Sequence, residues 1–80
     1  MANGSQIDGA VVAYLATTDG RWLKVAMVFG RVEEALGADL PEGQVGHDLF
    51  DRSIEALVSS GRLVAKGDIT RWRFSEVRSP

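Results

Sequence analysis

The amino-acid sequence predicts a single α+β domain in which three helices are followed by a C-terminal two-stranded β-hairpin. Apolar residues recur at helical spacing in three successive segments of residues 5–60. Turn-forming stretches separate these segments. Residues 61–80 then alternate apolar and polar side chains about a Gly67-Asp68 pair, a pattern typical of a β-hairpin. Together these observations favour a helical core completed by a small sheet.

The composition is that of one small globular domain. The chain has 80 residues, of which 45% are hydrophobic, and it contains no cysteine. The lack of cysteine excludes disulfides, cysteine zinc sites and thiol catalysis, and it fits a reducing cytoplasm. No apolar run approaches the roughly 20 residues of a membrane span, and the N-terminus lacks the features of a signal peptide. We therefore expect a cytoplasmic protein with a disordered N-terminus at residues 1–4 and one domain at residues 5–78.

The first helix is predicted from about Gln6 to Ala16. Ser5, followed three residues later by Asp8, resembles the capping box that begins many helices. A turn-forming run at residues 17–20 ends the helical pattern. The residues expected on the buried face recur at helical spacing: Ile7, Val11, Tyr14 and Leu15.

The second helix is predicted to begin after this turn, with Thr18 or Asp19 as its N-cap, and to end at Gly37. Its apolar residues form one continuous stripe: Trp22, Val25, Val28, Phe29, Val32 and Leu36. Because Trp22 belongs to this stripe, we expect it to pack in the core.

Residues 38–46 are predicted to form a loop that Leu40 and Val45 hold against the core. The third helix is expected over residues 47–60, with Gly61 ending it. Its buried face would contain five apolar residues: Leu49, Phe50, Ile54, Leu57 and Val58.

The hairpin is predicted to turn at Gly67 and Asp68, because glycine takes the positive φ that the first residue of a type II′ turn requires. This turn sets a register: Lys66 opposite Ile69, Ala65 opposite Thr70, Val64 opposite Arg71, Leu63 opposite Trp72 and Arg62 opposite Arg73. Since side chains alternate between the faces of a strand, the apolar residues gather on the inner face: Leu63, Ala65, Trp72 and Phe74. The basic residues gather on the outer face: Arg62, Lys66, Arg71 and Arg73.

Helices and hairpin in this order resemble the winged helix-turn-helix superfamily, in which the hairpin is the wing. The resemblance covers most of the chain, and two stretches carry it, ALVSSGRLVAKGD and RWRFSEV, in which the third helix ends in glycine and leads directly into the wing. The segments GRWLKVAMVFGRV and GDITRWRFSEVRSP are also similar to a bacterial family of unknown function, whose domain often forms the C-terminal part of a longer protein. These resemblances imply a fold and no activity. One departure is the predicted loop at residues 38–46, which is longer than the roughly 3 to 4 residues of a helix-turn-helix turn.

Charge is divided unevenly along the chain. Residues 1–60 contain nine acidic and four basic residues, a net charge of −5, whereas residues 61–80 contain two acidic and five basic residues, a net charge of +3. Such a change of sign within one small domain favours a directed binding surface, with internal charge complementarity as the alternative.

The leading functional hypothesis is a non-catalytic binding module that contacts an anionic partner through the basic face of the wing: Arg62, Lys66, Arg71 and Arg73. Alternatively, these side chains fold back on Glu33, Glu34, Glu55 or Glu76, or they keep an edge strand from aggregating. Winged helices often bind DNA by placing the third helix in the major groove. The outward face of that helix would present three carboxylates and one guanidinium here: His47, Asp48, Asp51, Arg52, Glu55 and Ser59. Because carboxylates repel phosphates, we expect an acidic protein surface rather than nucleic acid as the partner.

Two other functions remain open. One is a DNA-binding transcriptional regulator that uses residues 47–60 in the major groove. The other is a structural or dimerisation domain, since Val64 and Ile69 would expose apolar surface on the outer face of the wing. The two tryptophans, Trp22 and Trp72, could stack on single-stranded nucleic acid, but core packing is favoured for both.

Nothing in the sequence favours catalysis. His47 lies at helical spacing from Asp51 and Glu55, but one histidine beside carboxylates is weak evidence for a metal site. Ser53 has no base at a useful spacing for nucleophilic catalysis, and the sequence contains no phosphate-binding glycine loop. We therefore expect no enzymatic activity, no cofactor and no metal site.

Overall fold

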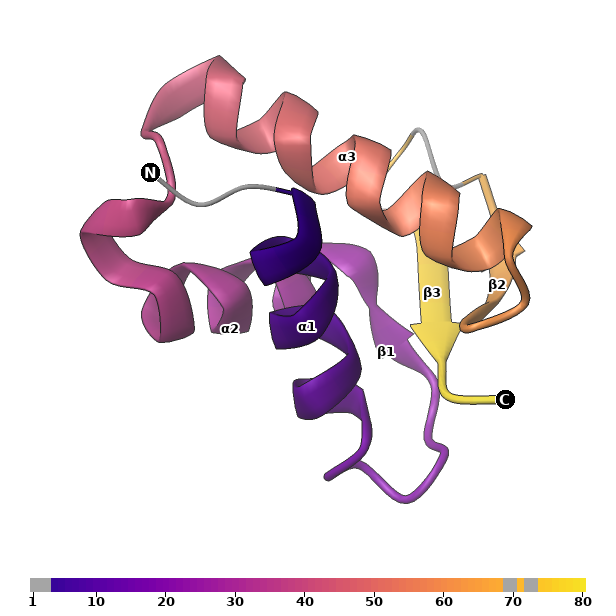
Figure 1. Ribbon diagram of the computed structural model, residues 1–80. Coiled ribbons are helices and arrows are strands. Elements are labelled where there is room, and N and C mark those ends of the chain that lie inside the picture. Colours follow the sequence, from indigo (N-terminus) through magenta and orange to yellow (C-terminus); the bar gives the residue numbers. More distant parts are fainter. Residues whose placement is uncertain (1–3, 69–70, 72–73) are drawn as a thin grey trace.

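Three helices form where the apolar stripes of the sequence lie: α1 (Gly4–Leu15), α2 (Val25–Leu36) and α3 (Gly43–Ser59). The computed structural model describes residues 4–68, 71 and 74–80. Within this part of the chain, the helices are joined by a three-stranded antiparallel sheet, so the protein is an α+β domain (Figure 1). A short 3-10 helix, η1 (Gly37–Asp39), connects α2 to α3.

The sheet contains β1 (Leu23–Lys24), β2 (Val64–Gly67) and β3 (Ser75–Arg78), in the spatial order β1, β3, β2. β3 is therefore the central strand. Figure 1 shows the sheet at one end of the molecule, beside the end of α3 and close to the C-terminus.

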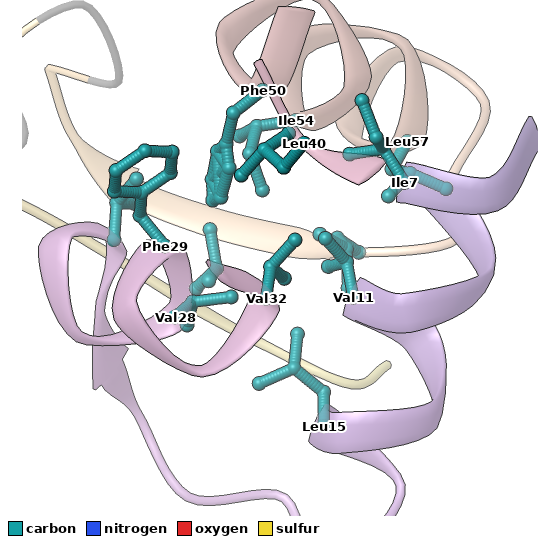
Figure 2. Close-up of a cluster of buried hydrophobic side chains, with 13 residues drawn as sticks. Ile7, Val11, Leu15, Val28, Phe29, Val32, Leu40, Phe50, Ile54 and Leu57 are labelled. Carbon is teal, nitrogen blue, oxygen red and sulfur yellow. The ribbon is translucent and has the colours of Figure 1, made fainter. Parts of the chain in front are cut away.

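A single apolar core lies between the three helices and the inner face of the sheet. Side chains of α1, α2 and α3 point toward one another in Figure 2, and the rings of Phe29 and Phe50 meet edge to face with their centroids 5.1 Å apart. Burying each such side chain contributes about 1.5–3 kcal/mol. The buried apolar residues are Ile7, Val11, Leu15, Val25, Val28, Phe29, Val32, Leu40, Phe50, Ile54, Leu57, Leu63 and Val77.

The stripes predicted for the helices are confirmed in the core, but the ends of the helices differ from the predictions. α1 begins at Gly4 and ends at Leu15, whereas the sequence pattern favoured Gln6 and Ala16. The carboxylate of Asp8, predicted as part of a capping box, accepts a hydrogen bond from the hydroxyl of Ser53 in α3.

The prediction that Thr18 or Asp19 caps the second helix and that Trp22 lies within it is wrong, because the N-cap of α2 is Lys24. Residues 23 and 24 form β1, which pairs with β3, and α2 begins only at Val25. Trp22 fits the helical spacing of the sequence, but the chain is not helical there. Backbone pairing with a strand distant in sequence overrides the local pattern. Trp22 is half-buried and does not belong to the buried core.

The third helix begins earlier than predicted, at Gly43, so the predicted loop at residues 38–46 is shorter. Gly46 lies inside the helix, where a Cβ atom would overlap the carbonyl oxygen of Pro41. Gly46, which the sequence pattern placed in a loop, is therefore required for the close contact of α3 with Pro41. Leu40 is buried as predicted, whereas Val45 is 57% exposed and does not hold the segment against the core.

The end of α3 directs the chain into the sheet. Gly61 has a φ of 80°, and its N–H donates to the carbonyl oxygen of Val58. The N–H of Arg62 donates to the carbonyl oxygen of Leu57, which completes the six-residue Schellman arrangement. The prediction that Gly61 ends the third helix is confirmed.

The hairpin forms, but its predicted two-residue turn and register are wrong. The observed partners are Val64 with Arg78, Ala65 with Val77, Lys66 with Glu76 and Gly67 with Ser75. Residues 68–74 thus connect the strands, with backbone hydrogen bonds from Arg71 to Asp68 and from Phe74 to Arg71. Val64 therefore pairs with Arg78 and not with Arg71 as predicted, and the partner of Lys66 in β3 is Glu76.

The physical reason for this error lies in which residue of the last strand fills the core. Val77 is fully buried, and Phe74, which the prediction placed on the inner face, is 67% exposed. Gly67 has the expected positive φ of 80°, but its Cα also lies against the carbonyl group of Phe74, where no side chain fits. Four further residues that the prediction placed in the hairpin lie outside the described part of the chain: Ile69, Thr70, Trp72 and Arg73.

Candidate functional site

The predicted partner-binding residues lie around the β2–β3 hairpin. Arg62 lies between α3 and β2, Lys66 lies in β2, and Arg71 lies in the connection between β2 and β3. All three are exposed, and Arg73 lies outside the described residues. Of the three described residues only Lys66 belongs to a strand, so Arg62, Lys66 and Arg71 do not form the continuous ladder face that the predicted register required.

The strand register creates a different basic surface on the side of the sheet that faces away from the helices. Lys24, Glu76 and Lys66 lie side by side across β1, β3 and β2. Because side chains alternate along a strand, Arg78 and its partner Val64 share this side. We call this surface the outer face, and it comprises Trp22, Lys24, Val64, Lys66, Glu76 and Arg78.

The opposite row of the sheet fixes which side is outer. Val77 is fully buried, and its partners Leu23 and Ala65 pack against the core. A slip of one residue would expose this row and bury the charged one, so the apolar row determines the register.

Trp22 lies at the centre of the cations of the outer face. The Nζ atom of Lys66 is 4.4 Å from the centroid of the indole ring, and the guanidinium carbon of Arg78 is 4.8 Å from it. Cations over an indole ring are attracted by its quadrupole, each contact being worth about 0.5–1 kcal/mol at an exposed site. The indole therefore holds two positive groups close together on the surface, and it is neither a core residue nor a free stacking platform.

One ion pair partly neutralises the outer face. The Nζ atom of Lys66 lies 3.8 Å from a carboxylate oxygen of Glu76, and the two side chains are 51% and 36% exposed. An exposed pair at this distance contributes little to stability. An ion pair with Glu76 was one of the alternatives predicted for the basic residues, and Lys66 forms this pair.

Two predicted residues remain available for a partner. In the described part of the chain, neither Arg62 nor Arg71 forms an ion pair, and both are exposed. Arg78 is exposed as well and carries its charge above the indole of Trp22. The hairpin thus presents several positive groups to solvent with two carboxylates among them, Glu76 in β3 and Asp68 in the connection.

The outward face of α3 exposes two of its three predicted carboxylates, and the third, Asp51, is half-buried. Asp48, Arg52 and Glu55 are exposed, and the side-chain amide of Gln44 donates a hydrogen bond of 2.9 Å to Asp48. His47 is half-buried, with its ring centroid 4.6 Å from that of Phe29. Its place is therefore explained by aromatic packing at the junction of α2 and α3.

Ser53 has a structural contact. It is buried, and its hydroxyl donates to the Asp8 carboxylate, which ties α3 to α1. Among the described residues, no group of three or more histidine, cysteine, aspartate or glutamate side chains is placed to hold a metal ion. No described helix combines the length and hydropathy that crossing a membrane requires.

A shallow hollow between α1 and α2 has a volume of about 480 Å³. Its charged rim is already paired, because the guanidinium of Arg31 lies 3.3 Å from the carboxylate of Glu34. The same guanidinium is 6.0 Å from the centroid of the Tyr14 ring. The other lining residues are alanines: Ala10, Ala13 and Ala35.

Sequence reasoning missed three members of the outer face, Trp22, Lys24 and Arg78. Recognising them requires knowing that β1 exists and pairs with β3. A strand of two residues has no period of its own, so its charged residue Lys24 reads equally well as part of a helix.

Comparison of the chain with models of known protein families, with curated proteins and with solved structures finds no match.

Proposed function

We propose that this protein is a winged-helix, non-catalytic module that binds an anionic partner, an acidic protein surface, through the cations around its hairpin. The predicted binding residues are Arg62, Lys66, Arg71 and Arg73, to which the strand register adds Lys24 and Arg78. A cytoplasmic location also stays a prediction.

The winged-helix assignment is supported by the order of the elements. Three helices precede the β2–β3 hairpin, and Gly61 leads α3 directly into β2. The connection between α2 and α3 covers residues 37–42, which is shorter than the loop predicted from the sequence. The departure from a helix-turn-helix is thus smaller than the sequence indicated.

The observation that carries the choice of partner is the separation of charge on the surface. Asp48 and Glu55 are exposed on α3, the helix that would enter a DNA groove, whereas Arg62 and Arg71 are exposed beside the sheet. Affinity for DNA comes chiefly from neutralising phosphates, and carboxylates on the inserted helix oppose it. An acidic protein surface fits the hairpin without meeting these carboxylates.

The proposal is tested by nuclear magnetic resonance titration of the labelled chain at low salt with polyglutamate and, separately, with generic duplex DNA. We expect polyglutamate to shift the amide signals around Arg62, Lys66, Arg71 and Arg73. Replacing two exposed cations together, Arg62→Glu and Arg71→Glu, should abolish these shifts and leave the fold intact. The matched control Arg52→Glu reverses an exposed arginine on α3 and should leave binding unchanged.

Two results would contradict the proposal. Shifts across residues 47–55 with duplex DNA, lost in Arg52→Glu, would support the DNA-binding regulator. A lack of shifts with both polymers, together with a sedimentation mass of twice 8.6 kDa, would support a dimerisation domain.

A further inference from the structure

We propose that the open edge of β2 binds its partner as an extended acidic segment, which adds one more strand to the sheet. This inference rests on the proposed function and specifies the form of the partner, namely an acidic peptide whose backbone pairs with β2.

The sheet order leaves β2 at an edge. β3 pairs with β1 on one side and with β2 on the other, whereas β3 is the only strand that pairs with β2 in the described residues. An edge strand presents unpaired backbone N–H and C=O groups, and extended peptides bind such edges through main-chain hydrogen bonds. Figure 1 shows β2 at the rim of the molecule.

The usable edge begins at Val64. The N–H groups of Arg62 and Leu63 both donate to the carbonyl oxygen of Leu57, at 2.9 and 3.2 Å, and so belong to the end of α3. The backbone of the four residues Val64–Gly67 is therefore the part that can pair with a peptide. Arg62 contributes only its side chain, at the entrance of the strand.

Side chains beside this edge alternate in a way that selects an acidic strand. Arg62 and Lys66 are exposed, and Val64 between them is half-buried on the same outer face. In an antiparallel pair, residues directly opposite each other have Cβ atoms about 4.5–5.5 Å apart on one face. A peptide with an acidic, an apolar and a second acidic residue at alternate positions therefore matches this edge in charge and in hydrophobicity.

The two cations contribute unequally to this match. Lys66 already contacts Glu76 and the indole of Trp22, so part of its interaction is taken within the chain. The guanidinium of Arg62 forms no ion pair in the described residues, and a guanidinium can bind a carboxylate through two parallel hydrogen bonds. Arg62 should therefore determine more of the affinity than Lys66.

A second copy of the chain fits this edge poorly. Two β2 strands paired antiparallel about Val64 would place Arg62 of each copy opposite Lys66 of the other. Like charges directly opposite each other destabilise a sheet, which is also why charged edges resist aggregation. The same charges that reject a copy of β2 attract an acidic strand.

The test uses a synthetic peptide with glutamate, valine and glutamate at alternate positions and threonine between them, titrated into the full labelled chain. Two N-methylated versions of the peptide each block one of the two alternating sets of backbone N–H groups. We expect slowed hydrogen exchange at the β2 amides on binding. One of the two methylated peptides should bind about tenfold more weakly than the unmodified peptide, and the other should bind equally well. The reason is that only one set of the peptide's backbone N–H groups faces the edge of β2.

Charge variants separate the inference from the function on which it rests. Arg62→Glu should weaken binding more than Lys66→Glu, and Arg52→Glu should leave it unchanged. Equal binding of both methylated peptides, still lost in Arg62→Glu, would overturn strand addition while supporting the proposed function. No binding of the peptide or of polyglutamate would overturn both. Stronger binding of single-stranded DNA at β2, or pairing of two chains through β2, would also overturn the inference.

Discussion

The three helices and the small sheet differ in how much apolar surface holds each in place. Each helix contributes at least three buried apolar side chains to the core, whereas the three strands contribute a single buried apolar side chain, Val77. Leu63 adds a second anchor just before β2. The position of the sheet therefore depends on few side chains and on backbone geometry at Gly61 and Gly67.

This difference suits a division of roles between the two regions. The helices bury apolar surface on several successive turns, and this packing provides most of their stability. The sheet leaves one side for charged residues, and its edge strand β2 is paired on a single side in the described part of the chain. The surface proposed for a partner thus lies on the region that contributes least to the core.

The largest expected effect tests the helical region. Phe50 is fully buried in α3 and contacts the ring of Phe29. Phe50→Ala should lower the free energy of unfolding by about 3–5 kcal/mol, because it removes apolar contacts and leaves a cavity. For a domain of this size the total is roughly 4–12 kcal/mol, so urea denaturation should show a variant close to unfolding. Met27→Ala, at a residue that is 52% exposed, should change the same quantity by less than about 0.5 kcal/mol. A similar loss in both variants would contradict the described core.

A smaller effect tests the register of the sheet. Val77 is fully buried and Phe74 is 67% exposed, although the sequence favoured Phe74 as the inner residue. Val77→Ala should therefore lower the free energy of unfolding by about 2 kcal/mol, from two lost methyl groups and their cavity. Phe74→Ala should change it by less than about 0.5 kcal/mol. Thermal unfolding of the pair measures both, and a larger loss in Phe74→Ala would restore the tight-turn register.

The helices and the sheet also differ in how well the sequence predicts them. The stripes of α2 and α3 are predicted correctly at Phe29, Phe50 and Ile54, because helical order is local and many residues repeat the signal. β1 is not predicted, since two residues carry no period and their pairing with β3 joins segments far apart in the sequence. The same applies to the outer face, where Arg78 becomes recognisable only from the register.

The register predicted for the hairpin is wrong for a related reason. The signal at Gly67 correctly indicates a positive φ, but it does not reveal how many residues the connection contains. Burying large aromatic residues favoured the shortest connection, whereas Val77 fills the available space in the core. Lys66 stays on the outer face in both registers, and Arg71 moves from a strand to the connection.

The smallest expected effect compares one buried serine from each region. In the helical region, Ser53 donates its hydroxyl to Asp8, whereas in the sheet the buried hydroxyl of Ser75 has no hydrogen-bond partner in the described structure. A buried hydroxyl without a partner has lost its bonds to water without replacement, so Ser75→Ala should raise the free energy of unfolding by about 1 kcal/mol. Ser53→Ala removes a satisfied bond and leaves the carboxylate without it, so it should lower the same quantity by about 1 kcal/mol. Urea denaturation of both variants gives the two signs directly. A destabilised Ser75→Ala would mean that this hydroxyl is hydrogen-bonded, and that polar contacts hold the sheet as they hold α1 to α3.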